Sequence, residues 1–173
     1  MGGYELIAVV VFFLIGYWVV DYFWPKQGAA LAVAGRTTVR VSRLFEAPPD
    51  RVFGAWLDPL TAGKWLFATP AGEMVRVEID ARVGGAFAFT DRRDGEDVEH
   101  VGKYLEIDRP RRLVFNFRVP KFSNEAALIR IEFAPATFGC ELTLAHEGVF
   151  PEYATRTEEG WKGILEGLNR SLA

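Results

Sequence analysis

Residues that could carry acid–base or metal chemistry are few in this chain, which has two histidines and one cysteine. His146 continues the alternation of Leu142 and Leu144, so its imidazole is predicted to point inward with them. There it could anchor a ligand by a hydrogen bond, act as a general base with a pKa near neutrality, or bond to the backbone at a strand end. The sequence leaves these three roles open.

The other candidate groups favour structural roles. His100 lies in the least clearly patterned strand and is expected to be exposed, and Cys140 is expected to be a buried apolar residue. Two histidines and one cysteine are too few and too far apart for a zinc site, so no metal and no cofactor are expected. Carboxylates whose strand positions alternate outward suit solvation better than catalysis: Glu73, Glu78, Asp80 and Glu132.

Alternating and helical periods indicate the elements that must position these groups. A half-buried strand over residues 39–45 ends at Pro48 and Pro49, and a short amphipathic helix then runs to just before Pro59. Alternation predicts six further strands, around residues 75–79, 87–89, 99–107, 113–119, 129–133 and 140–146. Consecutive strands at such regular spacing favour an antiparallel sheet. Val75, Val77 and Ile79 are predicted to share one face.

The chain ends in a predicted amphipathic helix that Pro151 can start. Its apolar stripe consists of Trp161, Ile164, Leu165, Leu168 and Leu172. Three glycines weaken the helix by up to about 1 kcal/mol each relative to alanine. They are Gly160, Gly163 and Gly167. Either they permit close approach to the sheet or they let the helix flex, and the sequence does not decide.

Several motifs together resemble one family. They are Ala47-Pro48-Pro49, Val52-Phe53-Gly54-Ala55-Trp56, Trp65, Asp80-Ala81-Arg82-Val83-Gly84-Gly85 and Gly160-Trp161. This order is similar to that of the homologues of the heat-shock protein 90 ATPase activator (AHSA-type), a branch of the START-like (SRPBCC, Bet v 1-like) superfamily. The resemblance covers roughly residues 37–172. It implies an α+β helix-grip fold, a curved antiparallel sheet around a long C-terminal helix with a cavity between them.

Bulky residues in the inward phase are the candidate ligand-binding residues of that cavity, since ligand pockets are mostly apolar with a few placed polar groups. They are Trp65, Phe87, Phe89, Phe115, Phe117, Ile131, Leu142, Leu144, His146, Trp161 and Leu165. Trp65 and Trp161 are expected to form lids or walls. The alternative is that these side chains simply fill the core.

Residues 1–25 are predicted to form a single transmembrane anchor. Residues 4–24 would make a helix of about 31 Å, enough to cross a bilayer core of about 30 Å. A cleaved signal peptide and a soluble buried helix are the alternatives. Residues 26–36 are interpreted as a linker and residues 37–173 as the START-like domain. Basic residues follow the apolar segment and none precedes it, which predicts a single-pass cell-membrane protein with a cytoplasmic domain.

Composition narrows the function further. A net charge of −3 argues against nucleic acid as a partner, because phosphates require a basic face. The expected function is a membrane-anchored domain that binds a small hydrophobic molecule or lipid. The alternatives are a co-chaperone-like or regulatory interaction module with a chaperone partner, and a cavity enzyme that uses His146. Whether any catalysis occurs is not decided by the sequence.

Overall fold

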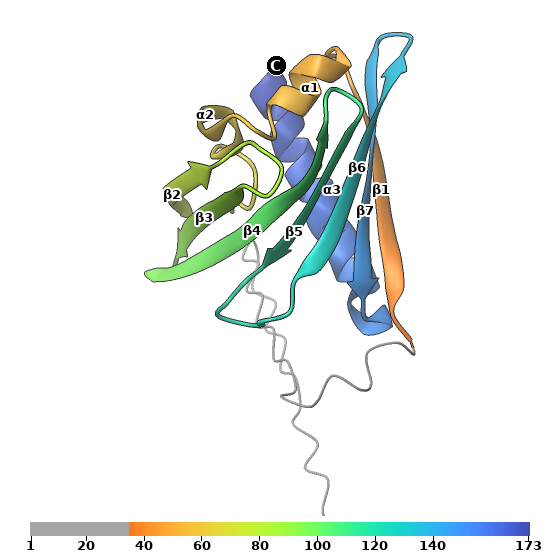
Figure 1. The fold of residues 1–173 in the computed structure, drawn as a ribbon. Helices are drawn as coiled ribbons and strands as arrows, with labels where there is room; N and C mark the ends of the chain where they lie inside the picture. Colours follow the sequence, from red (N-terminus) through yellow and green to blue (C-terminus); the bar gives the residue numbers. More distant parts are fainter. Residues whose placement is uncertain (1–34) are drawn as a thin grey trace, which may run out of the picture.

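The computed structural model describes residues 35–173 (Figure 1). The predicted anchor, residues 1–25, and nearly all of the predicted linker, residues 26–36, lie outside these described residues. Between residues 35 and 173, no helix combines the length and the apolar character needed to cross a membrane.

A seven-stranded antiparallel sheet and a long C-terminal helix make up the domain. The elements are β1 (Thr37–Phe45), α1 (Pro49–Gly54), α2 (Pro59–Ala62), β2 (Glu73–Ile79), β3 (Ala86–Arg93), β4 (Glu96–Asp108), β5 (Arg112–Arg118), β6 (Ala127–Ala136), β7 (Gly139–Val149), η1 (Pro151–Tyr153) and α3 (Ala154–Leu172). The strand order is β1-β7-β6-β5-β4-β3-β2, and every pairing is antiparallel. The predicted α+β helix-grip architecture is therefore confirmed for the described residues.

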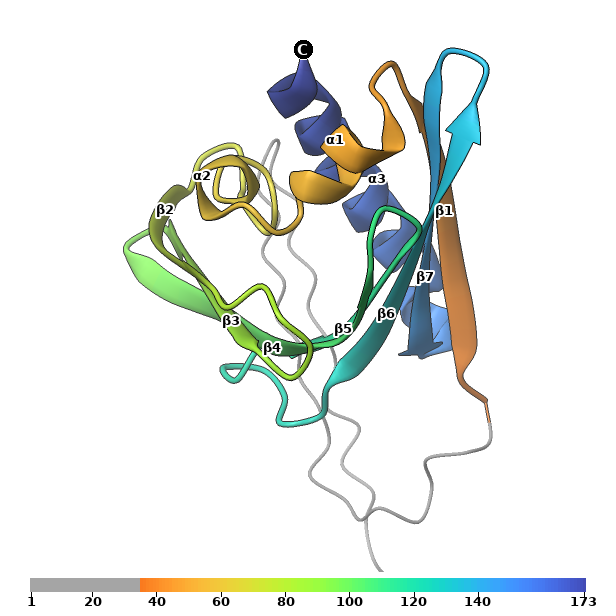
Figure 2. The same ribbon diagram turned by 45° about the horizontal axis from the view of Figure 1, so that its top comes forward.

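The sheet bends around α3, with α1 and α2 on the same concave side (Figure 2). Gly102 of β4 lies in close contact with its neighbours, because a Cβ there would clash with the carbonyl oxygen of Asn116 and the ring of Phe87. A glycine inside a strand commonly marks such a close approach of backbones. Register shifts in β2 and β4 add further irregularity to the same half of the sheet.

The apolar core lies between the concave face of the sheet and the helices. From α3, Trp161, Leu165 and Leu168 are buried against it. From α1, Val52 and Phe53 are fully buried. Removing each such side chain from water stabilises the fold by about 1.5 to 3 kcal/mol, so α3 is fixed mainly by its apolar stripe.

The predicted common face of Val75, Val77 and Ile79 is wrong at its first residue. A register shift between Met74 and Arg76 lets the chain bulge, so Val75 is 38% exposed while Met74 packs on the core. An extra residue in one strand reverses the in-and-out alternation on one side of the bulge.

The three glycines of α3 differ in their surroundings. A Cβ on Gly167 would lie 3.1 Å from Cβ of Trp65, whereas Cβ atoms on Gly160 and Gly163 would meet no atom within 4 Å. Gly167 therefore permits close approach, and its neighbour is the segment after α2 rather than the sheet.

This contrast predicts opposite consequences for two alanine substitutions. Gly163→Ala should raise the free energy of unfolding by about 0.5 to 1 kcal/mol, because alanine favours the helix and meets no neighbour. Gly167→Ala should gain less or lose stability, because its Cβ crowds Trp65. Urea unfolding of both variants measures the difference. A Gly167→Ala protein at least as stable as Gly163→Ala would contradict this account of the packing.

Candidate functional site

The structure places most of the predicted ligand-binding residues in a well-packed interior. Eight of them, each at most 4% exposed, line no part of the cleft near the start of α3: Trp65, Phe87, Phe89, Phe115, Ile131, Leu142, Leu144 and Leu165. Their rings contact one another or other core rings, as in Phe87 with Phe115 at 5.6 Å between centroids and Trp65 edge-on to Trp56 at 4.8 Å. Such contacts agree with the alternative that these side chains fill the core, and their role in binding stays a prediction. Trp161 is equally buried, at 4%, but does line that cleft.

The remaining three predicted residues, Phe117, His146 and Trp161, lie together at a cleft near the start of α3. The cleft consists of two cavities that share Phe117, Val119 and His146. The helix-side cavity, of about 170 Å³, is lined by residues of α3 and also by Phe67 and His100. The strand-side cavity, of about 160 Å³, extends past the end of β7 to Phe150 and Arg36. We call the two together the α3 cleft.

A hydrogen bond between His146 and Trp161 joins β7 to α3 at this cleft. The indole Nε1–H of Trp161 donates to Nδ1 of His146 at 3.0 Å. Because an indole nitrogen only donates, Nδ1 carries the lone pair and the neutral imidazole holds its proton on Nε2. Burial lowers the pKa of His146 to about 4. At neutral pH the side chain is therefore a hydrogen-bond donor through Nε2, which disfavours the open alternative of a general base with a pKa near neutrality.

His100 was expected to be exposed, and this expectation is wrong. Only 8% of the residue is exposed, and its ring stacks on Phe67 at 4.4 Å with an interplanar angle of 10°. The alternation of Val98, His100 and Tyr104, all buried in β4, is the sequence signal that could have revealed it. Burial, helped by the charge of Arg93, lowers the pKa of His100 to about 3. A weak backbone interaction with Val98 opposes this shift, but Nδ1 is buried and forms no hydrogen bond of good geometry among the described residues.

Phe67 is a wall residue that the sequence analysis missed. It lies between α2 and β2, where no periodicity marks an inward side, and its φ is 61°, a value rare for bulky residues. Its ring lies 5.1 Å from that of Phe117 and 6.4 Å from that of Trp161. Backbone strain of this kind is often found at functional sites.

Polar contacts behind Phe67 hold it in place. Arg93 donates to the carbonyl oxygen of Phe67 at 3.3 Å and to the carboxylate of Asp91 at 2.7 Å. Asp91 is fully buried and also accepts from the hydroxyl of Thr69 at 2.7 Å. The positive charge of Arg93 at the rim of the cleft is thereby matched by a buried carboxylate.

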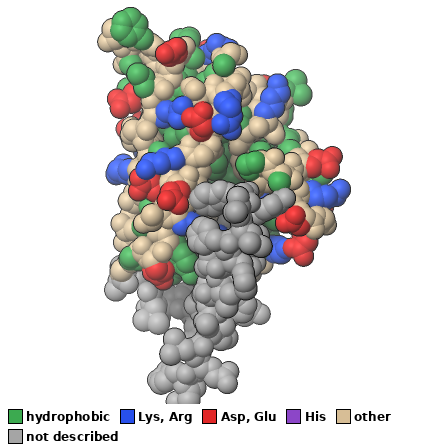
Figure 3. Space-filling model, turned by 180° about the vertical axis from the view of Figure 1, so that it is seen from behind, with side chains coloured by type: hydrophobic (Ala, Val, Ile, Leu, Met, Phe, Trp, Pro, Cys, Tyr) green, Lys and Arg blue, Asp and Glu red, His purple; other side chains and the backbone are tan. Residues whose placement is uncertain are grey.

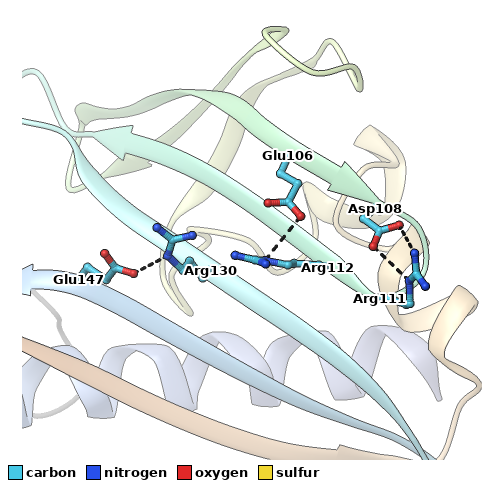
Figure 4. Close-up of polar contacts among 6 residues, drawn as sticks. All are labelled: Glu106, Asp108, Arg111, Arg112, Arg130 and Glu147. Carbon is cyan, nitrogen blue, oxygen red and sulfur yellow. Dashed lines mark hydrogen bonds and ion pairs between the residues drawn. The ribbon is translucent and has the colours of Figure 1, made fainter.

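Charged groups elsewhere gather on the outer face of the sheet. Figure 4 shows ion pairs between Arg130 and Glu147 at 2.5 Å, Arg112 and Glu106 at 3.6 Å, and Arg111 and Asp108 at 3.0 Å. Exposed pairs of this kind contribute only about 0 to 1 kcal/mol each. The outer face is thus solvated, and the α3 cleft differs from it in its apolar walls.

The described residues offer little for catalysis. Cys140 is fully buried, and burial raises the pKa of its thiol, so it is a poor nucleophile at neutral pH. Within residues 35–173, no group of three or more His, Cys, Asp or Glu side chains could hold a metal ion. The arrangement is suited to holding an apolar molecule beside two neutral imidazoles.

An antiparallel sheet bent around a long C-terminal helix defines the helix-grip class, the START-like or SRPBCC superfamily. Within it, a family model described as "Activator of Hsp90 ATPase homolog 1-like protein" matches residues 46–173. The chain belongs to this family. No functionally curated protein matches it.

Solved structures agree with this assignment. A protein from Chromobacterium violaceum is 31% identical with a TM-score of 0.69, and the match covers 77% of this chain and 95% of that one. A protein from Rhizobium loti is 28% identical with a TM-score of 0.66, covering 79% and 96%. An AHSA1-like protein from Aeromonas hydrophila is 20% identical with a TM-score of 0.69, covering 79% and 92%, and shows the fold alone.

The lowered pKa of His100 predicts a specific loss of stability in acid. Its folded-state pKa of about 3 lies below the unfolded value of about 6.5, so between these pH values the unfolded state binds the extra proton. The stability that the uncharged, buried His100 contributes is therefore fully present above pH of about 6.5 and is lost as the pH falls toward 3. Between pH 7 and pH 4, the free energy of unfolding should fall by about 1 to 3 kcal/mol more in wild type than in His100→Phe. The phenylalanine keeps a ring beside Phe67.

Urea unfolding of both proteins at several pH values measures this difference. Carboxylates titrate equally in the two proteins, so the comparison isolates His100. A stability difference that stays constant with pH would show that this imidazole is not buried as described.

Proposed function

We propose that this protein binds a small, largely apolar molecule in the α3 cleft. The observation that carries the proposal is that two cavities with aromatic walls meet at Phe117 and His146. Ligand pockets characteristically combine apolar walls with a small number of placed polar groups. Here the walls come from Phe67, Phe117 and Trp161, and the polar groups include the two histidines.

The volume of the α3 cleft suggests the size of the ligand. Its cavities measure about 170 and 160 Å³. An apolar cavity of about 150 Å³ can hold a benzene molecule. Each cavity is therefore large enough for one ring or a short alkyl group, and a two-ring compound or the end of an amphiphile would fit the pair.

A lipid or isoprenoid from the bilayer is the ligand source we favour. Arg36 lines the strand-side cavity and donates to the carbonyl oxygen of Gly148 at 3.1 Å, and β1 begins at the next residue. If residues 4–24 form the proposed anchor, the 11 residues of the linker, 26–36, span at most about 40 Å. The cleft would then open within reach of the cytoplasmic membrane surface, and tethering would raise the local lipid concentration.

A regulatory interaction with a chaperone is the alternative that the family description suggests. The family description names activation of the Hsp90 ATPase. Such a role in this protein would require contacts between its outer surface and the chaperone. Seen from behind, the described surface carries interspersed acidic and basic side chains (Figure 3). An Hsp90 ATPase assay with this chain would distinguish this alternative from ligand binding.

Two leucine substitutions on α3 test the proposed binding. Gly160 lines the helix-side cavity, and Gly163 does not, yet both positions have open space for a side chain. Gly160→Leu should occupy the cavity and lower ligand occupancy at least tenfold, whereas Gly163→Leu should leave it unchanged. Both leucines favour the helix over glycine, so neither should destabilise the fold.

The measurement compares molecules extracted from the full-length wild type and from both variants after purification in the same way. Mass spectrometry should find a compound that is depleted in Gly160→Leu and retained in Gly163→Leu. Lipids that adhere to the N-terminal segment would be equal in all three samples. Identical extracts from the two variants would overturn binding in the α3 cleft.

A further inference from the structure

Two imidazoles line the helix-side cavity, and each has a nitrogen that is not used within the described protein. His100 comes from β4 and His146 from β7, and the ring of Phe117 lies between them, 6.4 Å and 5.9 Å away between centroids. The polar character of the cleft therefore depends on what these nitrogens can donate or accept.

His146 offers a donor. Its Nδ1 is occupied by the indole N–H of Trp161, which fixes the proton on Nε2. No acceptor for this Nε2–H is found in residues 35–173. A ligand oxygen in the cleft could accept this hydrogen bond.

His100 has the more demanding requirement. Its Nδ1 is buried and forms no hydrogen bond of good geometry in the described part of the chain, although a weak backbone interaction with Val98 acts on the imidazole. A buried polar atom that is poorly satisfied costs stability. In one tautomer Nδ1 is a donor and in the other it is an acceptor. A hydroxyl group suits either tautomer, because it has one hydrogen to donate and two lone pairs to accept.

The surrounding charges disfavour an anionic partner at this position. The charge of Arg93 is already matched by Asp91, which is buried with it. Arg156, the other cation of this cavity, also has an interaction of its own. Both imidazoles are neutral at pH 7, because burial lowers the pKa of each. A ligand carboxylate bound beside His100 would lose its hydration without forming an ion pair that compensates for this loss.

We propose that the α3 cleft selects an uncharged apolar molecule with a hydroxyl group, such as an alcohol or phenol, and that His100 binds this hydroxyl. The inference rests on the proposed binding function and adds the chemical class of the ligand. His146 supplies a donor for a second oxygen or for the same hydroxyl in another pose. Phe67, Phe117 and Trp161 enclose the apolar part.

Three naphthalene derivatives of nearly equal shape test this selectivity: 2-naphthol, 2-methylnaphthalene and 2-naphthoate. Binding is measured at pH 7 by calorimetry with the full-length chain in lipid nanodiscs, after subtraction of empty nanodiscs. For wild type, 2-naphthol should bind about tenfold more tightly than 2-methylnaphthalene, as expected for one buried hydrogen bond. 2-Naphthoate should bind more weakly than 2-naphthol.

The variant His100→Phe keeps a ring next to Phe67 and removes both nitrogens. It should lose about tenfold in affinity for 2-naphthol and stay within about twofold for 2-methylnaphthalene. Gly163→Leu, which lies outside the cleft, should match wild type for both compounds. This pattern would support hydroxyl recognition by His100.

Other outcomes separate the two proposals. If 2-methylnaphthalene binds as tightly as 2-naphthol, or 2-naphthoate binds most tightly, the hydroxyl inference is overturned while binding in the cleft stands. The same holds if His100→Phe weakens both neutral compounds equally. If none of the three compounds binds wild type, the proposed function fails, and the inference fails with it.

Discussion

A sheet can cover both flanks of a single helix only if it bends, and in this protein the bend depends on how closely β3, β4 and β5 approach one another. Gly102 allows that approach because a side chain there would strike the backbone of β5 and the ring of Phe87. The resulting hollow receives Trp161, Leu165 and Leu168 of α3. Burial of the apolar stripe of the helix stabilises the fold, and the bent sheet provides the concave surface against which the stripe packs.

The same packing decides where space remains. Around Phe87, rings from β3 and β5 pack against one another. Near the first turns of α3, the wall is formed by the loop residue Phe67 and by the ends of strands, which fill space less completely. The hydrogen bond from Trp161 to His146 holds helix and sheet together on this side of the cleft. Space and polar groups therefore occur together at the start of α3.

The sequence predicted the succession of strands along the chain well, because period-two alternation is a local signal. The sequence-based prediction was wrong where an irregularity in a strand, or a contact with residues distant in sequence, decides which way a side chain points. In β4, Gly102 interrupts the inward series of Val98, His100 and Tyr104 because it has no side chain, so this series was overlooked and His100 was misplaced. The bulge in β2 similarly displaced Val75. Phe67 could not be found because its position depends on Arg93 and Asp91, which are distant in sequence.

Within the candidate site, Phe117, His146 and Trp161 were recognised from their phase on a strand or helix. What the phase could not provide is the distinction between a side chain that faces a cavity and one that faces another side chain. Leu144 and His146 share one side of β7, yet Leu144 is fully buried and His146 borders both cavities. That distinction depends on how far β7 extends beyond the packed part of α3.

The bond between an indole and an imidazole at the wall of a cleft has an optical consequence. Emission from an indole shifts with the polarity around it and is quenched by a nearby protonated imidazole. Trp161 should therefore act as a built-in reporter whose colour and brightness follow both the filling of the neighbouring space and the charge of His146. Trp161 is one of five tryptophans in the chain, and among the described residues it is the one that lies in the wall of the α3 cleft beside His146.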